Sequence, residues 1–159
     1  MTQVTGPPVI DAKKRSDPLM VLVLSPADLN ELTKLRIALM VLVSTYVGFT
    51  MAGGRGGWLL GATLLATALA CMGASVLNQV IEHHRDALMQ RTRNRPIPAG
   101  RITAASALVL GLALVLTGAL VAMISVNGLM AAVLVFTVAS YTLVYTPLKQ
   151  VTSLATIVG

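Results

Sequence analysis

Residues 58–86 read WLLGATLLATALACMGASVLNQVIEHHRD, and this stretch decides the fold class. Trp58 to Ile81 is apolar for long enough to cross a bilayer, which takes about 20 residues. Near the end of this run, Asn78, Glu82 and Asp86 follow one another at a spacing of four. Each step of four turns a helix by about 40°, so the three side chains share one face. The stretch predicts a membrane helix that ends in a polar face.

The composition of the whole chain agrees with a membrane protein. Of 159 residues, 55% are hydrophobic and 11% are charged, whereas a soluble domain carries about 25% charged residues. We attribute the net charge of +6 to basic residues that set the membrane topology, and we do not expect nucleic-acid binding. The single cysteine, Cys71, excludes an internal disulfide framework and is predicted to be a buried bystander.

We expect an all-α, polytopic membrane bundle with four spans. Leu32 to Arg36 is predicted to be the interfacial start of the first span, and glycines at 53–57 and the Asn127-Gly128 pair are predicted turns. Residues 1–28 are expected to form a disordered or interfacial segment, and residues 29–159 the membrane domain. Within that domain the predicted spans are 37–52, 58–81, 104–126 and 129–148, with a site loop at 82–103.

The basic residues predict the orientation. Eleven of the twelve lysines and arginines fall on one side of this topology, and only Arg55 falls on the other. Positive residues accumulate on the cytoplasmic side of membrane proteins. We therefore expect a multi-pass protein of the cell (inner) membrane, with both termini of this chain and the central loop in the cytoplasm.

The polar face and the loop after it suggest a site for a metal and a polyanion. Carboxylate and amide oxygens suit Mg²⁺, which often shares its ligands with phosphates. Arg91, Arg93 and Arg95 alternate, and Pro96 disfavours helix at Arg95, so we expect an extended row of guanidinium groups suited to phosphate. The alternatives are solvated acids at a membrane edge and arginines that contact anionic lipid headgroups.

Three further patterns are an alanine series, a tyrosine–lysine pair and a histidine pair, and the first two leave two interpretations each. Alanines at a spacing of four, residues 62, 66, 70 and 74, predict close helix packing or a groove for an apolar substrate tail. Tyr145 and Lys149, also four apart, are either two phosphate donors or an aromatic-belt tyrosine and a topology lysine. The adjacent His83 and His84 point about 100° apart on a helix, so they cannot jointly chelate one metal.

Four segments of the chain resemble the UbiA-type intramembrane prenyltransferases. They are the N-x₃-E-x₃-D run from Asn78, then DALMQRTRNRPIPAGRI (86–102), YTPLKQVTS (145–153) and LNELTKLRI (29–37). The resemblance covers most of Leu29 to Gly159. The wording of the 86–102 segment is similar to the branch of the family that farnesylates protohaem IX.

This resemblance implies transfer of a farnesyl group from farnesyl diphosphate to haem b. It implies that Asn78, Glu82 and Asp86 hold Mg²⁺ and the diphosphate, and that the diphosphate is also bound by Arg91, Arg95, Tyr145 and Lys149. The rival hypotheses are a related enzyme with another aromatic or tetrapyrrole acceptor, and a non-catalytic four-helix scaffold or transporter half.

The chain departs from the family pattern in two ways. Leu35 and Ala155 stand where the family usually has Pro and Asn. Family members have about nine membrane helices and a second acidic motif, for which this chain has no counterpart. We therefore expect the chain to be the N-terminal half of such an enzyme, to need a C-terminal half as partner, and to be inactive alone.

Overall fold

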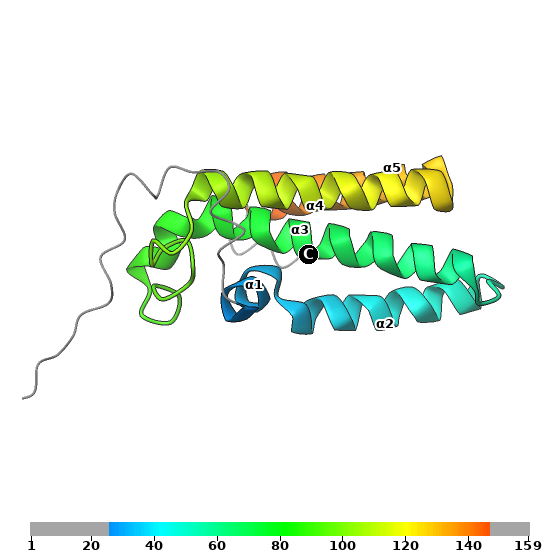
Figure 1. Cartoon of the computed structure of the whole chain (residues 1–159), viewed down its shortest axis with the longest axis horizontal. Coiled ribbons are helices and arrows are strands. Elements are labelled where there is room, and N and C mark those ends of the chain that lie inside the picture. Colours follow the sequence, from blue (N-terminus) through cyan, green and yellow to red (C-terminus); the bar gives the residue numbers. More distant parts are fainter. Residues whose placement is uncertain (1–25, 147–159) are drawn as a thin grey trace, which may run out of the picture.

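The computed structural model describes residues 26–146, which form helices joined by turns, with no strand in that range. Figure 1 shows a bundle whose long helices run side by side along one axis. Its elements are α1 (Pro26–Thr33), α2 (Leu35–Met51), α3 (Trp58–Leu88), α4 (Ala104–Ser125), α5 (Gly128–Ala139) and the π-helix η3 (Ser140–Tyr145). The expected all-α fold is confirmed.

Three helical stretches are long and apolar enough to cross a membrane: α3, α4, and α5 continued by η3. A fourth is obtained if α1 and α2, which meet at a bend of 51°, count as one broken span. The protein is therefore a multi-pass membrane protein. The fourth predicted span, 129–148, ends outside the described residues.

The start of the bundle is helical. α1 begins at Pro26, inside the segment that we expected to be disordered or interfacial, and Lys34 separates α1 from α2 in a left-handed conformation, with φ of 48°. A non-glycine residue is strained there. α2 begins at Leu35, so the break forms without the proline that the family resemblance led us to expect.

The segment predicted as the site loop, 82–103, begins as helix, because α3 continues to Leu88 and keeps Glu82 and Asp86 on the helix face predicted from their spacing. Residues 82–88 contain no glycine or proline to stop a helix, and the chain first becomes extended at Met89. The 31 residues of α3 span about 46 Å, against about 30 Å for the hydrocarbon core of a bilayer. If Trp58 marks one boundary, Asn78 lies near the other, and Glu82 and Asp86 project beyond it.

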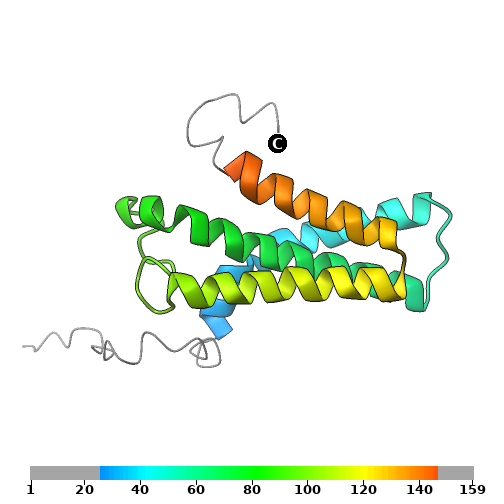
Figure 2. The same ribbon diagram turned by 90° about the horizontal axis from the view of Figure 1, so that it is seen from above.

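Close packing of α3 on α4 forms the centre of the bundle (Figure 2). A Cβ on Gly73 would lie 2.8 Å from the Gly111 carbonyl oxygen, and a Cβ on Gly118 would lie 2.8 Å from the Ala66 carbonyl oxygen. Only glycine allows the two backbones to approach this closely, as in other membrane helix pairs.

The short helix α1 is fastened to α3 where α3 leaves the bilayer. Leu32 is fully buried against Val76, Ile97 and Ile102. The buried Gln79 side chain donates through Nε2 to the carbonyl oxygens of Glu31 (3.2 Å) and Leu32 (2.7 Å). Because helix ends leave their last carbonyls unsatisfied, this contact caps α1 and holds it against α3.

The last described span changes its winding before the site. Asn127 caps α5 by accepting a hydrogen bond from the Met130 N–H at 2.7 Å, which confirms the predicted turn. From Ser140 to Tyr145 the helix is a π-helix, and the Thr146 N–H bonds back to the Tyr141 carbonyl. Such wide turns rotate the residues that follow them and are frequent at functional sites.

Candidate functional site

Asn78 and Glu82 form the inner part of a polar cluster at the end of α3. The Asn78 amide is 1% exposed and donates through Nδ2 to Glu82 Oε2 at 2.9 Å. Its oxygen accepts a hydrogen bond of 2.8 Å from the Thr146 hydroxyl, which is fully buried. The shared helix face predicted from the spacing of four therefore includes a direct contact between the first two side chains.

Asp86 forms the outer part of the cluster and is held by the loop. Its carboxylate is buried and accepts from the Arg95 guanidinium, with 2.6 Å between Asp86 Oδ2 and Arg95 Nη1. Thr92 donates its hydroxyl to the Asp86 carbonyl oxygen at 3.0 Å. These two contacts fold the loop back over the last turn of α3.

The prediction of an extended arginine row is wrong. Residues 89–103 form consecutive turns, with backbone hydrogen bonds such as Arg95 N to Thr92 O and Arg101 N to Pro96 O. Among residues 26–146, Arg95 is the one of the three alternating arginines that reaches an acid. Arg91 and Arg93 are exposed, and among residues 26–146 neither side chain makes a hydrogen bond or ion pair. The turn hydrogen bonds and the Asp86–Arg95 ion pair hold residues 89–103 in a compact loop.

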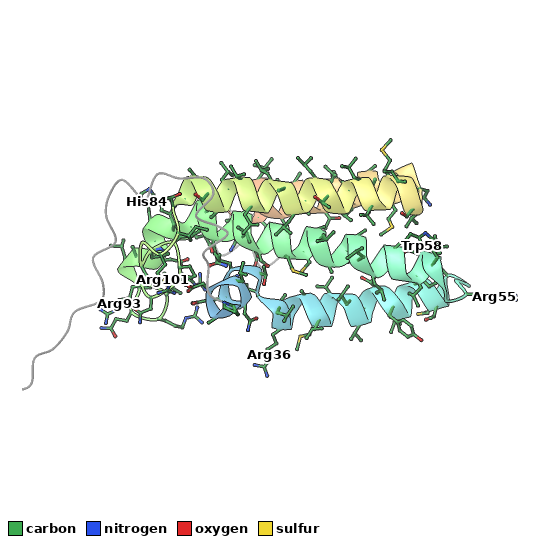
Figure 3. The ribbon with its side chains drawn as sticks, in the orientation of Figure 1. Arg36, Arg55, Trp58, His84, Arg93 and Arg101 are labelled. Atoms are coloured by element: carbon green, nitrogen blue, oxygen red, sulfur yellow. The ribbon has the colours of Figure 1, made fainter. Side chains whose placement is uncertain are left out.

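Arg101 fixes the other end of the loop to α1. Its Nε lies 2.7 Å from Asp28 Oδ1, its Nη2 lies 3.6 Å from Glu31 Oε2, and the same nitrogen donates to the Asn94 carbonyl oxygen at 2.9 Å. Figure 3 shows Arg93 and Arg101 at one end of the bundle, with Arg55 and Trp58 at the opposite end. Arg101 thus supports the loop that carries Arg95.

The donor chemistry of the cluster fits a hard cation. Two carboxylates and an amide supply only oxygen ligands, which Mg²⁺ and Ca²⁺ prefer. Residues 26–146 contain no group of three His, Cys, Asp or Glu side chains placed to hold a metal, so any such site would depend on the amide oxygen of Asn78. That oxygen is buried and its orientation is fixed.

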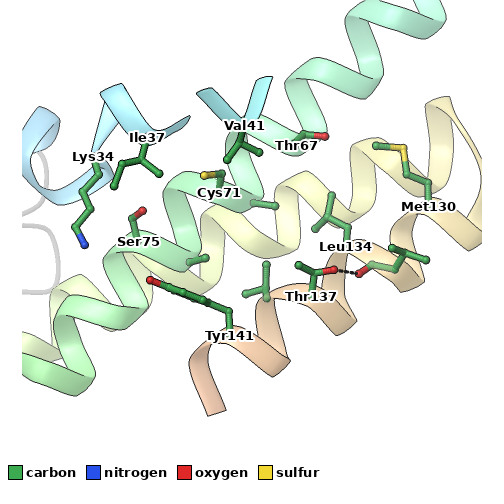
Figure 4. A pocket seen from close by; sticks show the side chains of 14 residues that line it. Lys34, Ile37, Val41, Thr67, Cys71, Ser75, Met130, Leu134, Thr137 and Tyr141 are labelled. Atoms are coloured by element: carbon green, nitrogen blue, oxygen red, sulfur yellow. Dashed lines mark hydrogen bonds between the residues drawn. The ribbon is translucent and has the colours of Figure 1, made fainter. Parts of the chain in front are cut away.

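An apolar cavity of about 440 Å³ lies one turn below Asn78. It runs between α2, α3 and α5, and Figure 4 shows Cys71 and Ser75 on its α3 wall, facing Val41 and Tyr141. Its volume falls within the range of about 300–1,000 Å³ that small-molecule sites occupy. Lys34 is the one cation among its lining residues, all of which are described.

The alanine series packs closely in one part and lines the cavity in another. Ala66 is fully buried against Ala122 and Ala131, which is close packing. Ala70 and Ala74 line the cavity, and its role as a groove for a substrate tail stays a prediction. Cys71 also lines the cavity and is partly exposed, so its predicted burial is wrong, whereas its role as a bystander stays a prediction.

The remaining predicted residues are only partly placed. Tyr145 stacks on Tyr141, with ring centroids 5.5 Å apart, and Lys149 lies outside the described residues, so their pairing stays a prediction. The rings of His83 and His84 are 3.9 Å apart. His83 Nδ1 lies 2.6 Å from the Val80 carbonyl oxygen, which only accepts, so this nitrogen carries a proton.

Sequence reasoning missed three residues of the site. Thr146 follows Tyr145 directly, but no spacing links it to Asn78, 68 positions earlier. Lys34 was counted only for topology, although it lines the cavity. Gln79 lies beside Asn78 and carries the contact to α1. For Gln79, the sequence did contain a signal, namely a glutamine inside an apolar run.

Comparisons with known proteins agree with this arrangement. Residues 41–159 match the UbiA prenyltransferase family. A protoheme IX farnesyltransferase of Myxococcus xanthus is 42% identical over 134 residues, which is 84% of this chain and 46% of that protein. One of Solibacter usitatus is 38% identical over 143 residues, or 83% of this chain and 49% of that protein. No solved structure matches the chain.

Another similar protein, the protoheme IX farnesyltransferase of Flavobacterium johnsoniae, is 38% identical and covers 83% of this chain and 45% of its own length. The chain therefore spans about half the length of the relatives that it matches.

Proposed function

We propose, since the chain belongs to the UbiA prenyltransferase family, that it binds farnesyl diphosphate for transfer of the farnesyl group to protohaem IX. The observation that carries this proposal is the continuity of one helix. On α3 the polar cluster of Asn78, Glu82 and Asp86 leads within one turn to Ala74 and the apolar cavity. A ligand with a diphosphate head and a long apolar tail needs a polar site that continues directly into an apolar cavity.

In this proposal the diphosphate lies at the polar cluster. Asn78, Glu82 and Asp86 hold a divalent cation, for which Mg²⁺ is proposed on donor chemistry. When bound, the cation supplies neutralisation of the charge that develops on the departing diphosphate. Arg95 is already at the cluster, and Arg91, Tyr145 and Lys149 are the further proposed contacts to phosphate oxygens.

The farnesyl chain lies in the cavity between α2, α3 and α5. Its walls exclude water from the allylic carbon, which matters because loss of diphosphate leaves a carbocation that water would capture. Lys34 stands at the side of the cavity where α2 begins, and its charge favours the anionic end of the substrate there.

In the proposed orientation the protein lies in the cell membrane and its polar cluster faces the cytoplasm. The arginine-rich loop lies at one end of the bundle and Arg55 at the other (Figure 3), as the positive-inside rule requires. Haem b is the proposed acceptor because the similar proteins are protoheme IX farnesyltransferases.

Binding is the primary test, because the chain spans about half the length of its relatives. The chain in lipid nanodiscs is titrated with farnesyl diphosphate, with and without Mg²⁺, by calorimetry. We expect Mg²⁺-dependent binding that Glu82→Gln weakens by about 10-fold or more, whereas Arg93→Gln, at an exposed arginine, leaves it nearly unchanged.

Equal affinity in Glu82→Gln and the unsubstituted chain would refute the proposed metal site and favour a non-catalytic scaffold. Farnesol serves as the second ligand. If it binds as tightly as farnesyl diphosphate, the polar cluster does not recognise the diphosphate.

A further inference from the structure

The polar groups of the cavity between α2, α3 and α5 gather at one of its ends. α2 runs antiparallel to α3, and α5 runs parallel to α3 (Figure 2), so the start of α2 lies at the level of the later turns of both. Lys34, Ser75 and Tyr141 are therefore the lining residues nearest the polar cluster. Figure 4 shows the Lys34 amino group and the Ser75 and Tyr141 hydroxyls on this side of the cavity, with Thr67 and Met130 towards the other.

The threonine hydroxyls on the cavity wall are bonded within their own helices. Thr67 donates to the Thr63 carbonyl oxygen and Thr137 donates to the Val133 carbonyl oxygen, each at 2.8 Å. A hydroxyl that is bonded back to its own helix leaves mainly the methyl group of the threonine to face a ligand. The cavity thus has an apolar body and one polar end.

Ser75 is the buried hydroxyl at that end. It is 8% exposed, and within residues 26–146 its hydroxyl makes no hydrogen bond. Buried polar groups are normally hydrogen-bonded, so a hydroxyl without a protein partner on a cavity wall indicates a ligand or water in the space that it faces. Ser75 lies three residues before Asn78, which makes the two side chains neighbours on the helix surface. A ligand bonded to Ser75 would continue directly into the polar cluster.

Lys34 supplies the positive charge at the same end. Its φ of 48° at the break between α1 and α2 is a conformation that the surrounding structure must hold in place. The hydrogen bond of 2.7 Å from Gln79 to the Leu32 carbonyl oxygen fastens the chain just before this break. Arg36, two residues later, is exposed and points away from the bundle in Figure 3. The break therefore places Lys34, and not Arg36, at the cavity.

We infer that Lys34 and Ser75 form a second anion contact, which binds the phosphate group attached directly to the farnesyl chain. The inference deepens the proposed function and rests on it: with the farnesyl chain in the cavity, the first phosphate lies at the polar end and the terminal phosphate at the polar cluster. An ammonium group supplies a point charge for phosphate, and a serine hydroxyl donates one hydrogen bond to it. This contact needs no metal ion, which separates it from the polar cluster.

The test uses farnesyl monophosphate without any divalent cation, titrated by calorimetry into the chain in phosphatidylcholine nanodiscs. We expect Lys34→Met, which keeps a long side chain and loses the charge, to weaken binding by about 10- to 100-fold. Ser75→Ala removes one hydrogen bond and is expected to weaken binding by about 5-fold. Arg36→Met, which removes a cation outside the cavity, should leave the affinity nearly unchanged.

Farnesol distinguishes a contact to phosphate from support of the cavity walls. It has the same apolar chain and no phosphate, so Lys34→Met should bind it as tightly as the unsubstituted chain does. Equal affinity of Lys34→Met and the unsubstituted chain for farnesyl monophosphate would overturn the inference. Equal losses for farnesol and farnesyl monophosphate would overturn it too, as would the absence of farnesyl monophosphate binding by the unsubstituted chain.

An anionic lipid headgroup is the other source of a phosphate at this end of the cavity. The titrations are therefore repeated in nanodiscs that also contain phosphatidylglycerol. Persistence of the Lys34→Met effect supports a site for the prenyl phosphate, whereas its disappearance would assign Lys34 to lipid and overturn the inference. Failure of the proposed function has a different signature: farnesyl monophosphate binds through Lys34, but neither Mg²⁺ nor Glu82→Gln changes the affinity for farnesyl diphosphate.

Discussion

On its α4 side, α3 uses small residues to bring two helices into contact, whereas on its α2 and α5 side it uses small residues to leave space. Gly73 faces the Gly111 backbone, where a single added carbon would collide. One residue on, Ala74 faces a cavity of about 440 Å³. A small side chain therefore has no fixed role: the distance of the neighbouring helix decides whether it closes an interface or opens a site.

The largest expected effect comes from disrupting the close contact between α3 and α4. Gly73→Leu would force its side chain against the Gly111 carbonyl and the Val115 backbone, so we expect a loss of about 3 kcal/mol in the free energy of unfolding. The measurement is unfolding in mixed detergent micelles followed by circular dichroism. Gly61→Leu, on the same helix with nothing within 4 Å of its added Cβ, is the matched control. Similar losses in both variants would show that helix propensity, and not the close approach, limits stability.

A smaller effect is expected from filling the cavity between α2, α3 and α5. Ala74→Leu places a larger side chain in the cavity, and we expect farnesyl diphosphate to bind about 20-fold more weakly, near 2 kcal/mol. Affinity for inorganic diphosphate and the unfolding free energy should stay the same, because the polar cluster and the α3–α4 contact are untouched.

The control for Ala74→Leu is Ala132→Leu, on α5 at an exposed position outside the cavity. If Ala74→Leu and Ala132→Leu bind farnesyl diphosphate equally well, the cavity does not hold the farnesyl chain.

The smallest expected effect is at the C-terminal end of α3, where Asp86 is paired with Arg95. Arg95→Gln removes the partner of the buried Asp86 carboxylate, and we expect it to cost about 1 kcal/mol of unfolding free energy. Arg93→Gln, at an exposed arginine of the same loop that makes no ion pair within the described part of the chain, should cost nothing measurable. Adding Asp86→Asn to Arg95→Gln should recover most of the loss. Additive losses in the double variant would mean that the two side chains act independently.

The sequence was sufficient for the features that depend on local chemistry. The period and length of the apolar runs predicted the helices, and the spacing of four correctly placed Asn78 and Glu82 in contact. It failed where a weak local preference competes with a tertiary contact. Pro96 favours extended chain before it, yet the Asp86–Arg95 ion pair and the turn bonds of the loop determine the fold of residues 89–103.

The candidate cation ligands were named from sequence alone, whereas Thr146, which contacts one of them, was not. Asn78, Glu82 and Asp86 lie on one helix, and helix geometry is known in advance. Thr146 reaches Asn78 only because α5 packs back beside α3 and its winding changes to a π-helix just before the contact.

By itself, the sequence determined that this is a helical membrane protein with an acidic face at the end of its second long apolar run, because burial and hydrogen bonding in lipid leave few alternatives. Only the tertiary structure decided which alanines pack and which line a cavity, and which arginine meets Asp86. Those outcomes depend on how closely neighbouring helices approach one another, and such distances are not encoded in any local pattern.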